Sequence, residues 1–333
     1  MGSRRTRWCC QATVNRMVSI CSLGEALIDF IPSETGRRLC EATSFSPAPG
    51  GAPANVAVGV SRLGTPSAFL GKIASDPFGD LLTATLTESD VNTTGVARTD
   101  EAKTSLAFVS LRADGERDFL FYRDPGADML YRPDEVDEGL IADAGILHFG
   151  SISLIAEPSR SATLHALDLA EASGTRISYD PNLRFPLWAD AHDARAGLLL
   201  GWSRARLIKA SDDEIRFLSG TDDLESGTRA LWTDRLDVVC VTQAGAGVTV
   251  FTADSAHAIP GLDVDAVDAT GAGDAFVAAL LSELAAAGPE PFAPEVLAEA
   301  ARFANAAAAL STTRSGAIPS LPTRAEVEAQ TVR

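Results

Sequence analysis

The chain has little of several features that would place it in other classes of protein. No apolar run approaches the roughly 20 residues of a transmembrane helix, so we expect no membrane span. The five cysteines lack the CxxC spacing of metal sites, which favours reduced thiols in an intracellular protein. Basic residues number 28 against 45 acidic ones, and the formal net charge of -17 argues against nucleic-acid binding. The four histidines are isolated from one another, which favours structural roles over metal ligation.

The chain is rich in apolar residues, which alternate between strand and helix patterns. Its 333 residues are 46% hydrophobic, enough for the core of one large domain. Strands are predicted at 146–149, 177–180, 207–209 and 238–242, with helices between them and two closing helices at 271–287 and 294–311. This alternation, with short connections, predicts an α/β fold with a doubly wound, mostly parallel sheet and helices on both faces.

The first third of the chain departs from that alternation. Strands are predicted at 18–23 and 27–31, a tight turn at 47–53 and a helix at 54–63. Two further apolar runs, 105–111 and 118–122, flank an Asp-Gly turn signal at 112–116, which is typical of a β-hairpin. We therefore predict a small β lid, formed by segments of about 27–50 and 92–125, over the edge where parallel sheets bind ligands.

Residues 1–17 differ in composition from the rest, with four arginines and no acidic residue. We predict a disordered basic extension in front of one domain at 18–333, and a cytoplasmic protein. Two alternatives stay open. The start matches a myristoylation pattern, with Cys9 and Cys10 available for palmitoylation, and the segment also suits a short plastid-targeting leader.

The stretch Asp268-Ala-Thr-Gly-Ala-Gly-Asp274 precedes an apolar run that predicts a buried helix. Gly271, Ala272 and Gly273 would then lie at the helix N-terminus, where unpaired N–H groups and the helix dipole attract an anion. Asp274, in the first turn, is placed to take a proton from a hydroxyl attacking that anion. An anion hole beside a base predicts phosphoryl transfer.

Further motifs occur in order along the chain, and together they resemble the ribokinase-like (PfkB) carbohydrate kinases, most closely the plant-type fructokinases. The resemblance covers about 18–322 and rests on the segments 24–30, 48–55, 110–117, 149–153, 180–184, 268–274 and 316–320. It implies ATP-dependent phosphorylation of D-fructose to fructose 6-phosphate, with Asp274 as catalytic base and Mg²⁺ as cofactor.

The resemblance also assigns a sugar site. Asp29 ends an apolar strand, where a carboxylate without partners would be costly but could accept bonds from adjacent sugar hydroxyls. Glycines at 50 and 51 allow a close approach of the backbone to a ligand. The full set of expected sugar-binding residues is Asp29, Gly50, Gly51, Asn55, Phe108, Phe121, Arg123 and Arg184.

Nucleotide and cation sites follow from the same resemblance. The expected ATP-binding residues are Asn182, Lys209, Thr242, Gly245, Gly247 and Asn305. The family's Asn-x-x-Glu appears here as Ser211-Asp-Asp-Glu214, which leaves Glu214 to contact Mg²⁺ through water. Ala244 replaces a glycine of the phosphate loop and requires a negative φ there. Some members use K⁺, and the matching oxygens belong to Asp268, Thr270, Ser311, Gly316 and Ser320.

Two rival functions stay open at this stage. A 2-keto-3-deoxygluconate kinase would share the Asp180-Pro-Asn-Leu-Arg184 segment and a lid arginine such as Arg123. A non-catalytic fructokinase-like assembly protein would be expected to have lost the base or the anion hole, and both are intact here. Homodimerisation through the lid is a further option that the sequence leaves undecided.

Overall fold

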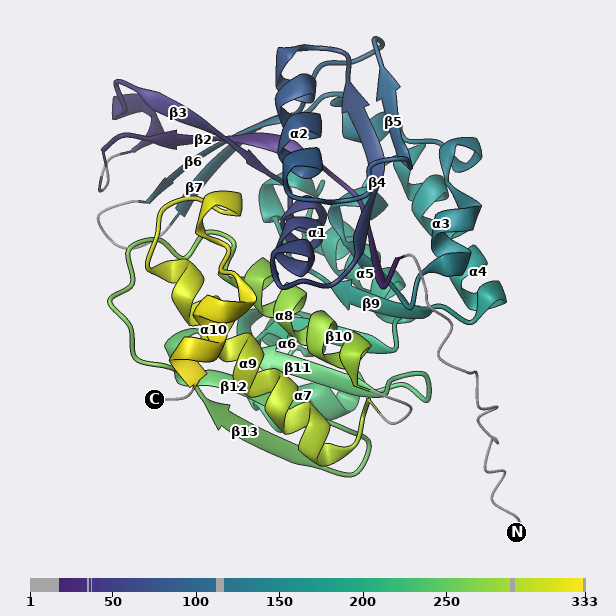
Figure 1. Ribbon diagram of the computed structural model, residues 1–333, viewed down its shortest axis with the longest axis vertical. Helices are drawn as coiled ribbons and strands as arrows, with labels where there is room; N and C mark the ends of the chain where they lie inside the picture. The colour runs from purple at the N-terminus through teal and green to yellow at the C-terminus, as the bar shows by residue number, and fades with distance from the viewer. Residues whose placement is uncertain (1–17, 35, 37, 112–116, 288–290, 332–333) are drawn as a thin grey trace.

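The computed structural model describes residues 18–34, 36, 38–111, 117–287 and 291–331 (Figure 1). The predicted extension at 1–17 and the predicted hairpin turn at 112–116 lie outside the described residues. None of the helices in the described part of the chain is long and apolar enough to cross a membrane.

A nine-stranded sheet forms the centre of the molecule, in the order β13-β12-β11-β10-β9-β8-β1-β4-β5. All neighbours pair in parallel except β11–β12 and β12–β13, which are antiparallel. The predicted mostly parallel sheet is therefore confirmed. The strands are β1 (Ile20–Leu23), β4 (Ser67–Ala74), β5 (Val96–Thr99), β8 (Ile146–Gly150), β9 (Arg176–Asp180), β10 (Leu207–Ser211), β11 (Val238–Thr242), β12 (Gly247–Phe251) and β13 (Ala256–Pro260).

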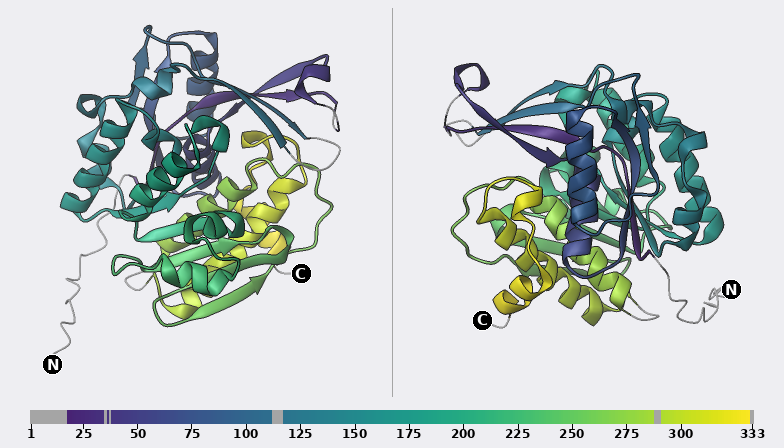
Figure 2. Two further views of the ribbon diagram at one scale, coloured as in Figure 1. Left: turned by 180° about the vertical axis from the view of Figure 1, so that it is seen from behind. Right: turned by 45° about the horizontal axis from the view of Figure 1, so that its top comes forward.

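Helices cover both faces of this sheet (Figures 1 and 2). One buried cluster joins α1, α8, α9 and α10 to one face, and a second joins α3, α4, α5 and α6 to the other. The helices are α1 (Ala52–Arg62), α2 (Pro77–Glu88), α3 (Glu138–Asp143), α4 (Ser159–Ser173), α5 (Ala191–Trp202), α6 (Asp212–Ser219), α7 (Leu224–Ala230), α8 (Ala272–Ala286), α9 (Pro294–Thr312) and α10 (Arg324–Thr331).

A second, four-stranded sheet projects from one end of the molecule (Figures 1 and 2). Its order is β3-β2-β6-β7, built from β2 (Leu27–Pro32), β3 (Phe45–Gly50), β6 (Leu106–Leu111) and β7 (Arg117–Tyr122). We call it the small sheet. The expected second lid segment began near residue 92, but β5 pairs with β4 in the large sheet. That segment of the small sheet therefore starts later, at Leu106.

The tight turn predicted at 47–53 is wrong. Residues up to Gly50 belong to β3, which pairs with β2 from Leu27↔Gly50 to Pro32↔Phe45. Pro47 and Pro49 have no N–H to donate to a ladder, but β3 is an edge strand, where prolines are tolerated. The chain then turns sharply at Gly51, whose φ of 103° is unfavourable for other residues, and α1 begins at Ala52.

Candidate active site

A cavity lies where the small sheet meets the carboxyl edge of the large sheet. Strand β2 and strands β6 and β7 supply one wall, and the starts of α1 and α8 supply another. The lining residues are Glu25, Leu27, Asp29, Gly51, Ala52, Asn55, Ala107, Val109, Phe121, Ile152, Asn182, Arg184, Thr270, Gly271 and Asp274. The fold thus brings together residues from seven separate segments of the chain.

The first turn of α8 carries the predicted anion hole and base. Gly271 caps the helix with a φ of 79°, and a Cβ there would lie 3.0 Å from Cα of Ala317, so glycine is required on two grounds. The N–H of Ala272 donates a long, 3.3 Å bond to the carbonyl of Ala269. Among the described residues, no acceptor faces the N–H groups of Gly271 and Gly273, which are free for an anion.

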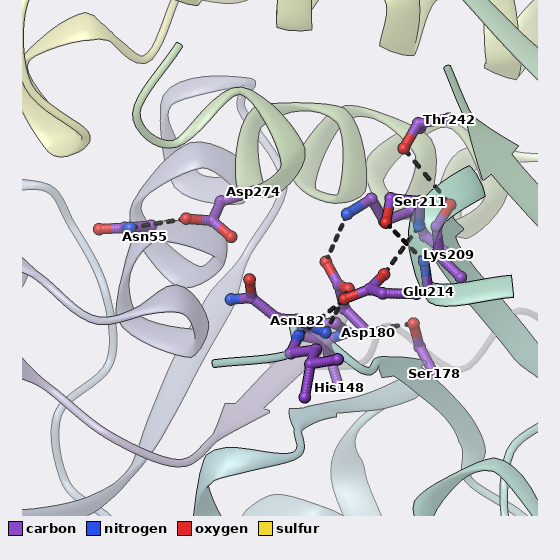
Figure 3. A network of polar contacts seen from close by, with 12 residues as sticks. Asn55, His148, Ser178, Asp180, Asn182, Lys209, Ser211, Glu214, Thr242 and Asp274 are labelled. Atoms are coloured by element: carbon purple, nitrogen blue, oxygen red, sulfur yellow. Dashed lines mark hydrogen bonds and ion pairs between the residues drawn. The ribbon is translucent and has the colours of Figure 1, made fainter. Parts of the chain in front are cut away.

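The buried carboxyl of Asp274 bonds to the first turn of α1. Nδ2 of Asn55 donates to Oδ2 of Asp274 over 2.7 Å, while Oδ1 of Asn55 is buried without a partner (Figure 3). Burial raises the pKa of Asp274 to about 6, although the bond from Asn55 lowers it. A carboxyl with that pKa is poised to accept a proton near neutral pH.

Asp29 lies on β2 and lines the same cavity as Asp274. Loss of hydration raises the pKa of Asp29 to about 7, Arg184 lowers it, and the nearby charge of Asp274 raises it further. A Cβ at Gly50 would lie 2.2 Å from Oδ2 of Asp29. We expected a ligand to approach the backbone at Gly50 closely. The group that does so is the carboxylate of Asp29, which has room because Gly50 has no side chain.

The loop after β9 carries Asn182 and Arg184, both of which line the cavity. The N–H of Asn182 donates to Oδ1 of Asp180 over 3.1 Å, and Asn182 has a φ of 42°, a conformation that asparagine tolerates better than most residues. A buried ion pair joins Oδ2 of Asp180 to Nζ of Lys209 over 3.0 Å. This network fixes the loop between the cavity and the end of β10 (Figure 3).

Lys209 lies next to the start of α8. Burial alone would lower the pKa of Lys209, but the carboxylates of Asp180 and Glu214 outweigh it and raise the pKa. A Cβ at Gly273 would lie 2.9 Å from Nζ of Lys209, so this ammonium group adjoins the free N–H groups of the helix. A fixed positive charge therefore lies beside the predicted anion hole, where it would attract an anion as well.

Glu214 has a local partner for each oxygen. Oε2 accepts the N–H of Ser211 over 2.8 Å and Oε1 accepts the N–H of Leu183 over 2.7 Å, while Oγ of Ser211 accepts the N–H of Glu214. The serine at position 211 thus forms a capping box with Glu214, which Ser-x-x-Glu predicts from the sequence. Burial and the charge of Asp180 raise the pKa of Glu214.

Three of the residues expected to bind ATP, Thr242, Gly245 and Gly247, lie where β11 turns into β12. Oγ1 of Thr242 donates to the carbonyl of Ala210 over 3.3 Å, and Gly247 has a φ of 105°. The negative φ expected at Ala244 is wrong, since this residue has a φ of 47°, in the left-handed region that favours glycine. Gly245 packs its backbone against Gly261.

Asn305 joins α9 to the end of β13. Its Nδ2 donates to the carbonyls of Ile259 and Pro260 over 3.3 Å and 3.1 Å. The structure therefore shows Asn305 bonded to the end of β13, and the expected contact with the adenine base stays a prediction.

The candidate K⁺ residues fall into two groups. Oδ1 of Asp268 accepts both the N–H and the hydroxyl of Thr270, and its Oδ2 accepts the N–H of Gly316 over 2.9 Å. The hydroxyls of Ser311 and Ser320 each donate over 2.8 Å to a carbonyl in their own turn, which leaves their lone pairs available. Across the described ranges, no cluster of three or more His, Cys, Asp or Glu side chains forms a metal site.

Three expected sugar-site residues, Gly50, Phe108 and Arg123, do not line the cavity. Phe108 alternates with Ala107 and Val109, which do, and so it points to the other face of the small sheet. There its ring stacks on Phe30 at 4.8 Å and meets Phe45 and Tyr122 edge-on. Phe108 therefore packs among aromatic rings on the face of the small sheet away from the cavity, and the structure offers no support for its expected contact with the sugar.

Arg123 is held in a buried ion pair. Its Nε and one terminal nitrogen each lie 2.7 Å from Oδ2 of Asp128, and the two side chains are 4% and 1% exposed. Oγ of Ser105 donates to the other oxygen of Asp128. Arg123 therefore sits behind the cavity wall, and the expected direct contact with substrate is not supported. Phe121, two residues earlier, does line the cavity.

Sequence reasoning missed Glu25, which lines the cavity and is 3% exposed. The signal was the same as for Asp29: a carboxylate in an apolar stretch, where burial without partners is costly. Its Oε1 accepts the N–H of Ala52, the first residue of α1, over 3.1 Å.

The chain is similar to known carbohydrate kinases along most of its length. The model of the pfkB family of carbohydrate kinases matches residues 17–324. A probable fructokinase-2 of Arabidopsis thaliana is 48% identical over 308 residues, covering 92% of this chain and 94% of the relative, and fructokinase-1 of Zea mays is 48% identical over 309 residues, covering 92% and 96%.

Solved structures give the same picture. A fructokinase from Xylella fastidiosa with bound ATP has a TM-score of 0.87 at 35% identity, covering 96% of this chain and 100% of that one. A fructokinase double mutant from Vibrio cholerae O395, with fructose, ADP and potassium ion bound, has a TM-score of 0.85 at 34% identity, covering 94% and 98%. The chain therefore belongs to the pfkB family of carbohydrate kinases.

Proposed function

We propose that this protein is a fructokinase, which transfers the γ-phosphoryl group of ATP to the primary hydroxyl of D-fructose and releases fructose 6-phosphate and ADP. The observation that carries the proposal is the buried pair of Asp274 and Asn55 beside the free N–H groups of α8, in a cavity that Asp29 also lines. The curated relatives and the fructose-bound structure named above support the choice of sugar.

In the proposed reaction, the fructose hydroxyl attacks the γ-phosphorus and gives its proton to Asp274. One O–P bond forms, the bond between the γ-phosphorus and the bridging oxygen breaks, and ADP leaves with that electron pair. Asn55 holds Oδ2 of Asp274, so that Oδ1 faces the hydroxyl. The N–H groups of Gly271, Ala272 and Gly273, together with Lys209, stabilise the charge on the transferring group, with Ala272 contributing least because of its turn bond.

The remaining residues bind the two substrates. Asp29 and Asn55 accept and donate bonds to sugar hydroxyls, Phe121 and the backbone at Gly50 and Gly51 shape the site, and Arg184 contacts the substrate or a phosphate. On the nucleotide side, the proposed residues are Asn182, Lys209, Thr242, Gly245, Gly247 and Asn305. Lid closure over the cavity would exclude water, which would otherwise hydrolyse ATP.

Two cations complete the proposal. Mg²⁺ bound to ATP would neutralise charge on the β- and γ-phosphates. Both oxygens of Glu214 already accept backbone N–H groups, so this residue fits Mg²⁺ through a water, and not as a direct ligand. Asp268, Thr270, Ser311, Gly316 and Ser320 supply the oxygens that would hold K⁺, and Asp268 already ties the loop before α8 to Gly316.

We also propose a cytoplasmic enzyme that dimerises through the small sheet. The face that carries Phe30, Phe108 and Tyr122 is partly exposed, with Tyr122 at 60% and Leu120 at 48%, which suits a protein interface. A plastid location or a lipid anchor, each through residues 1–17, is the alternative for localisation.

The rival substrate, 2-keto-3-deoxygluconate, brings a carboxylate and needs cations around it. Of the two arginines that favoured it, Arg123 is committed to Asp128 and only Arg184 lines the cavity. A panel of fructose, glucose, ribose and 2-keto-3-deoxygluconate, each with ATP and Mg²⁺ and read by ADP release, tests the proposal. We expect the highest kcat/KM with fructose, and a higher value for the keto acid would overturn the choice of sugar.

A further inference from the structure

Glu25 is the one cavity-lining carboxylate to which the proposed reaction gives no task. It follows β1, is 3% exposed, and lies with Asp29 and Asn55 among the residues that line the cavity. Its Oε1 is anchored on the N–H of Ala52, which fixes the side chain against the start of α1. Its Oε2 is buried and has no hydrogen-bond partner.

A buried carboxylate oxygen without a partner is costly, and native structures rarely keep one without a reason. A cation is near, but it is paired with another carboxylate: Arg123 influences Glu25 electrostatically, while two of its nitrogens lie 2.7 Å from Oδ2 of Asp128. Ser105 occupies the other oxygen of Asp128. The group of Glu25, Asp128 and Arg123 therefore contains two carboxyls and one guanidinium. Its net charge is -1 when both carboxyls are ionised.

We propose that Glu25 is a specificity-determining residue of the sugar site, whose carboxylate, backed by the Arg123–Asp128 pair, admits neutral sugars and disfavours sugars that carry a carboxylate. The inference rests on the proposed function and narrows its substrate class. Like charges in a site of low dielectric repel strongly, and an anionic sugar would meet Glu25 and Asp29 with only Arg184 lining the cavity as a compensating cation. A neutral hexose meets no such penalty.

Glu25→Gln is the matched perturbation. The amide oxygen of glutamine can keep the bond from Ala52, so the main change is the loss of charge. Asp128→Asn is a second, independent variant: it leaves the charge of Arg123 uncompensated and shifts the group in the same direction without touching Glu25. Glu171→Gln is the control, because this residue pairs with Arg204 and Arg235 and does not line the cavity.

The measurement is the ratio of Ki for 2-keto-3-deoxygluconate, as a competitor of fructose, to KM for fructose. It is made at pH 8, since burial raises the pKa of Glu25 to about 7 and the carboxylate is then mostly ionised. We expect this ratio to fall about 10-fold in Glu25→Gln and to fall in Asp128→Asn, with no change in Glu171→Gln. An unchanged ratio in Glu25→Gln overturns the proposal, and if that variant does not fold, an unchanged ratio in Asp128→Asn does so.

Failure of the proposed function looks different. If the wild-type protein releases no ADP with fructose, the enzymatic assignment fails, and calorimetric dissociation constants for fructose and the keto acid replace KM and Ki. The same fall in their ratio then supports the role of Glu25 in sugar selection, and a constant ratio overturns it.

Discussion

Replacing Asp274 with asparagine should lower activity and raise stability together. The variant keeps the shape of the side chain, and its amide oxygen can still accept the bond from Asn55. It cannot take a proton from the sugar hydroxyl, so we expect kcat to fall by about 10² to 10⁴, with little change in KM for fructose. At about 1.36 kcal/mol for each factor of ten, this is roughly 3 to 5 kcal/mol of lost transition-state stabilisation.

The gain in stability follows from the pKa of Asp274. Burial raises that pKa from 3.8 to about 6, so the ionised carboxylate is disfavoured in the folded state by on the order of 3 kcal/mol. The penalty is fully present well above pH 6 and shrinks as the pH falls from 6 towards 3.8, because the carboxyl of the folded state is then protonated while that of the unfolded state is still partly ionised. Asp274→Asn should therefore unfold with a free energy larger by about that amount at pH 8, and most of this gain should be lost at pH 4.

Steady-state ADP release gives kcat and KM, and urea unfolding at pH 8 and pH 4 gives the free energies. Asp234→Asn serves as the control, since this exposed residue should change stability by less than about 0.5 kcal/mol. Turnover within a factor of ten of the wild type would refute the assignment of the base. A stability gain that does not depend on pH would refute the electrostatic cause.

Four further results are expected. Asp29→Ala should raise KM for fructose by about 10-fold or more while leaving KM for ATP within about twofold, and equal effects on both would contradict a sugar contact. Gly50→Ala should raise the same KM, because its Cβ would lie 2.2 Å from the carboxylate of Asp29, and unaltered kinetics would argue against that crowding. Ala244→Gly should stabilise the fold by about 0.5 to 1 kcal/mol in urea unfolding, since it relieves a φ of 47° at the cost of a more flexible unfolded chain; a loss of stability would contradict this. Deletion of residues 2–17 should leave kcat unchanged, because every residue that lines the cavity follows them, and a loss of activity would move the domain boundary.

Features carried by contiguous motifs could be predicted from the sequence. The start of α8 is one example, because Gly271 and Asp274 lie within a single turn and their roles follow from local helix geometry. The bond between Asn55 and Asp274 is the opposite case, since 219 residues separate the two and no local pattern records that α1 and α8 lie side by side.

Three of the errors share one physical origin, which is that contacts made in the folded chain decide where a side chain lies. The residue type of Phe108 does not reveal which face of the small sheet its side chain occupies. A shift of the strand by one residue would move that side chain to the opposite face. Arg123 looked like a substrate ligand until its partner Asp128, five residues later, was brought next to it by the turn between them. Prolines at 47 and 49 suggested a turn because proline is rare inside strands. They are tolerated here because β3 is an edge strand paired with β2, and this pairing depends on the tertiary fold, which local sequence does not show.

The distance along the chain between Asn55 and Asp274 also bears on how the protein is made. At roughly 5 to 20 residues per second, a ribosome needs on the order of 10 to 40 s to synthesise the 219 residues between them. During that interval α1 has no α8 to pack against, and the surface around Gly59, which in the finished fold adjoins Ala278, stays uncovered. The nascent chain therefore presents an apolar helix face for many seconds, and that face is where we expect chaperones to engage it before its activity can begin.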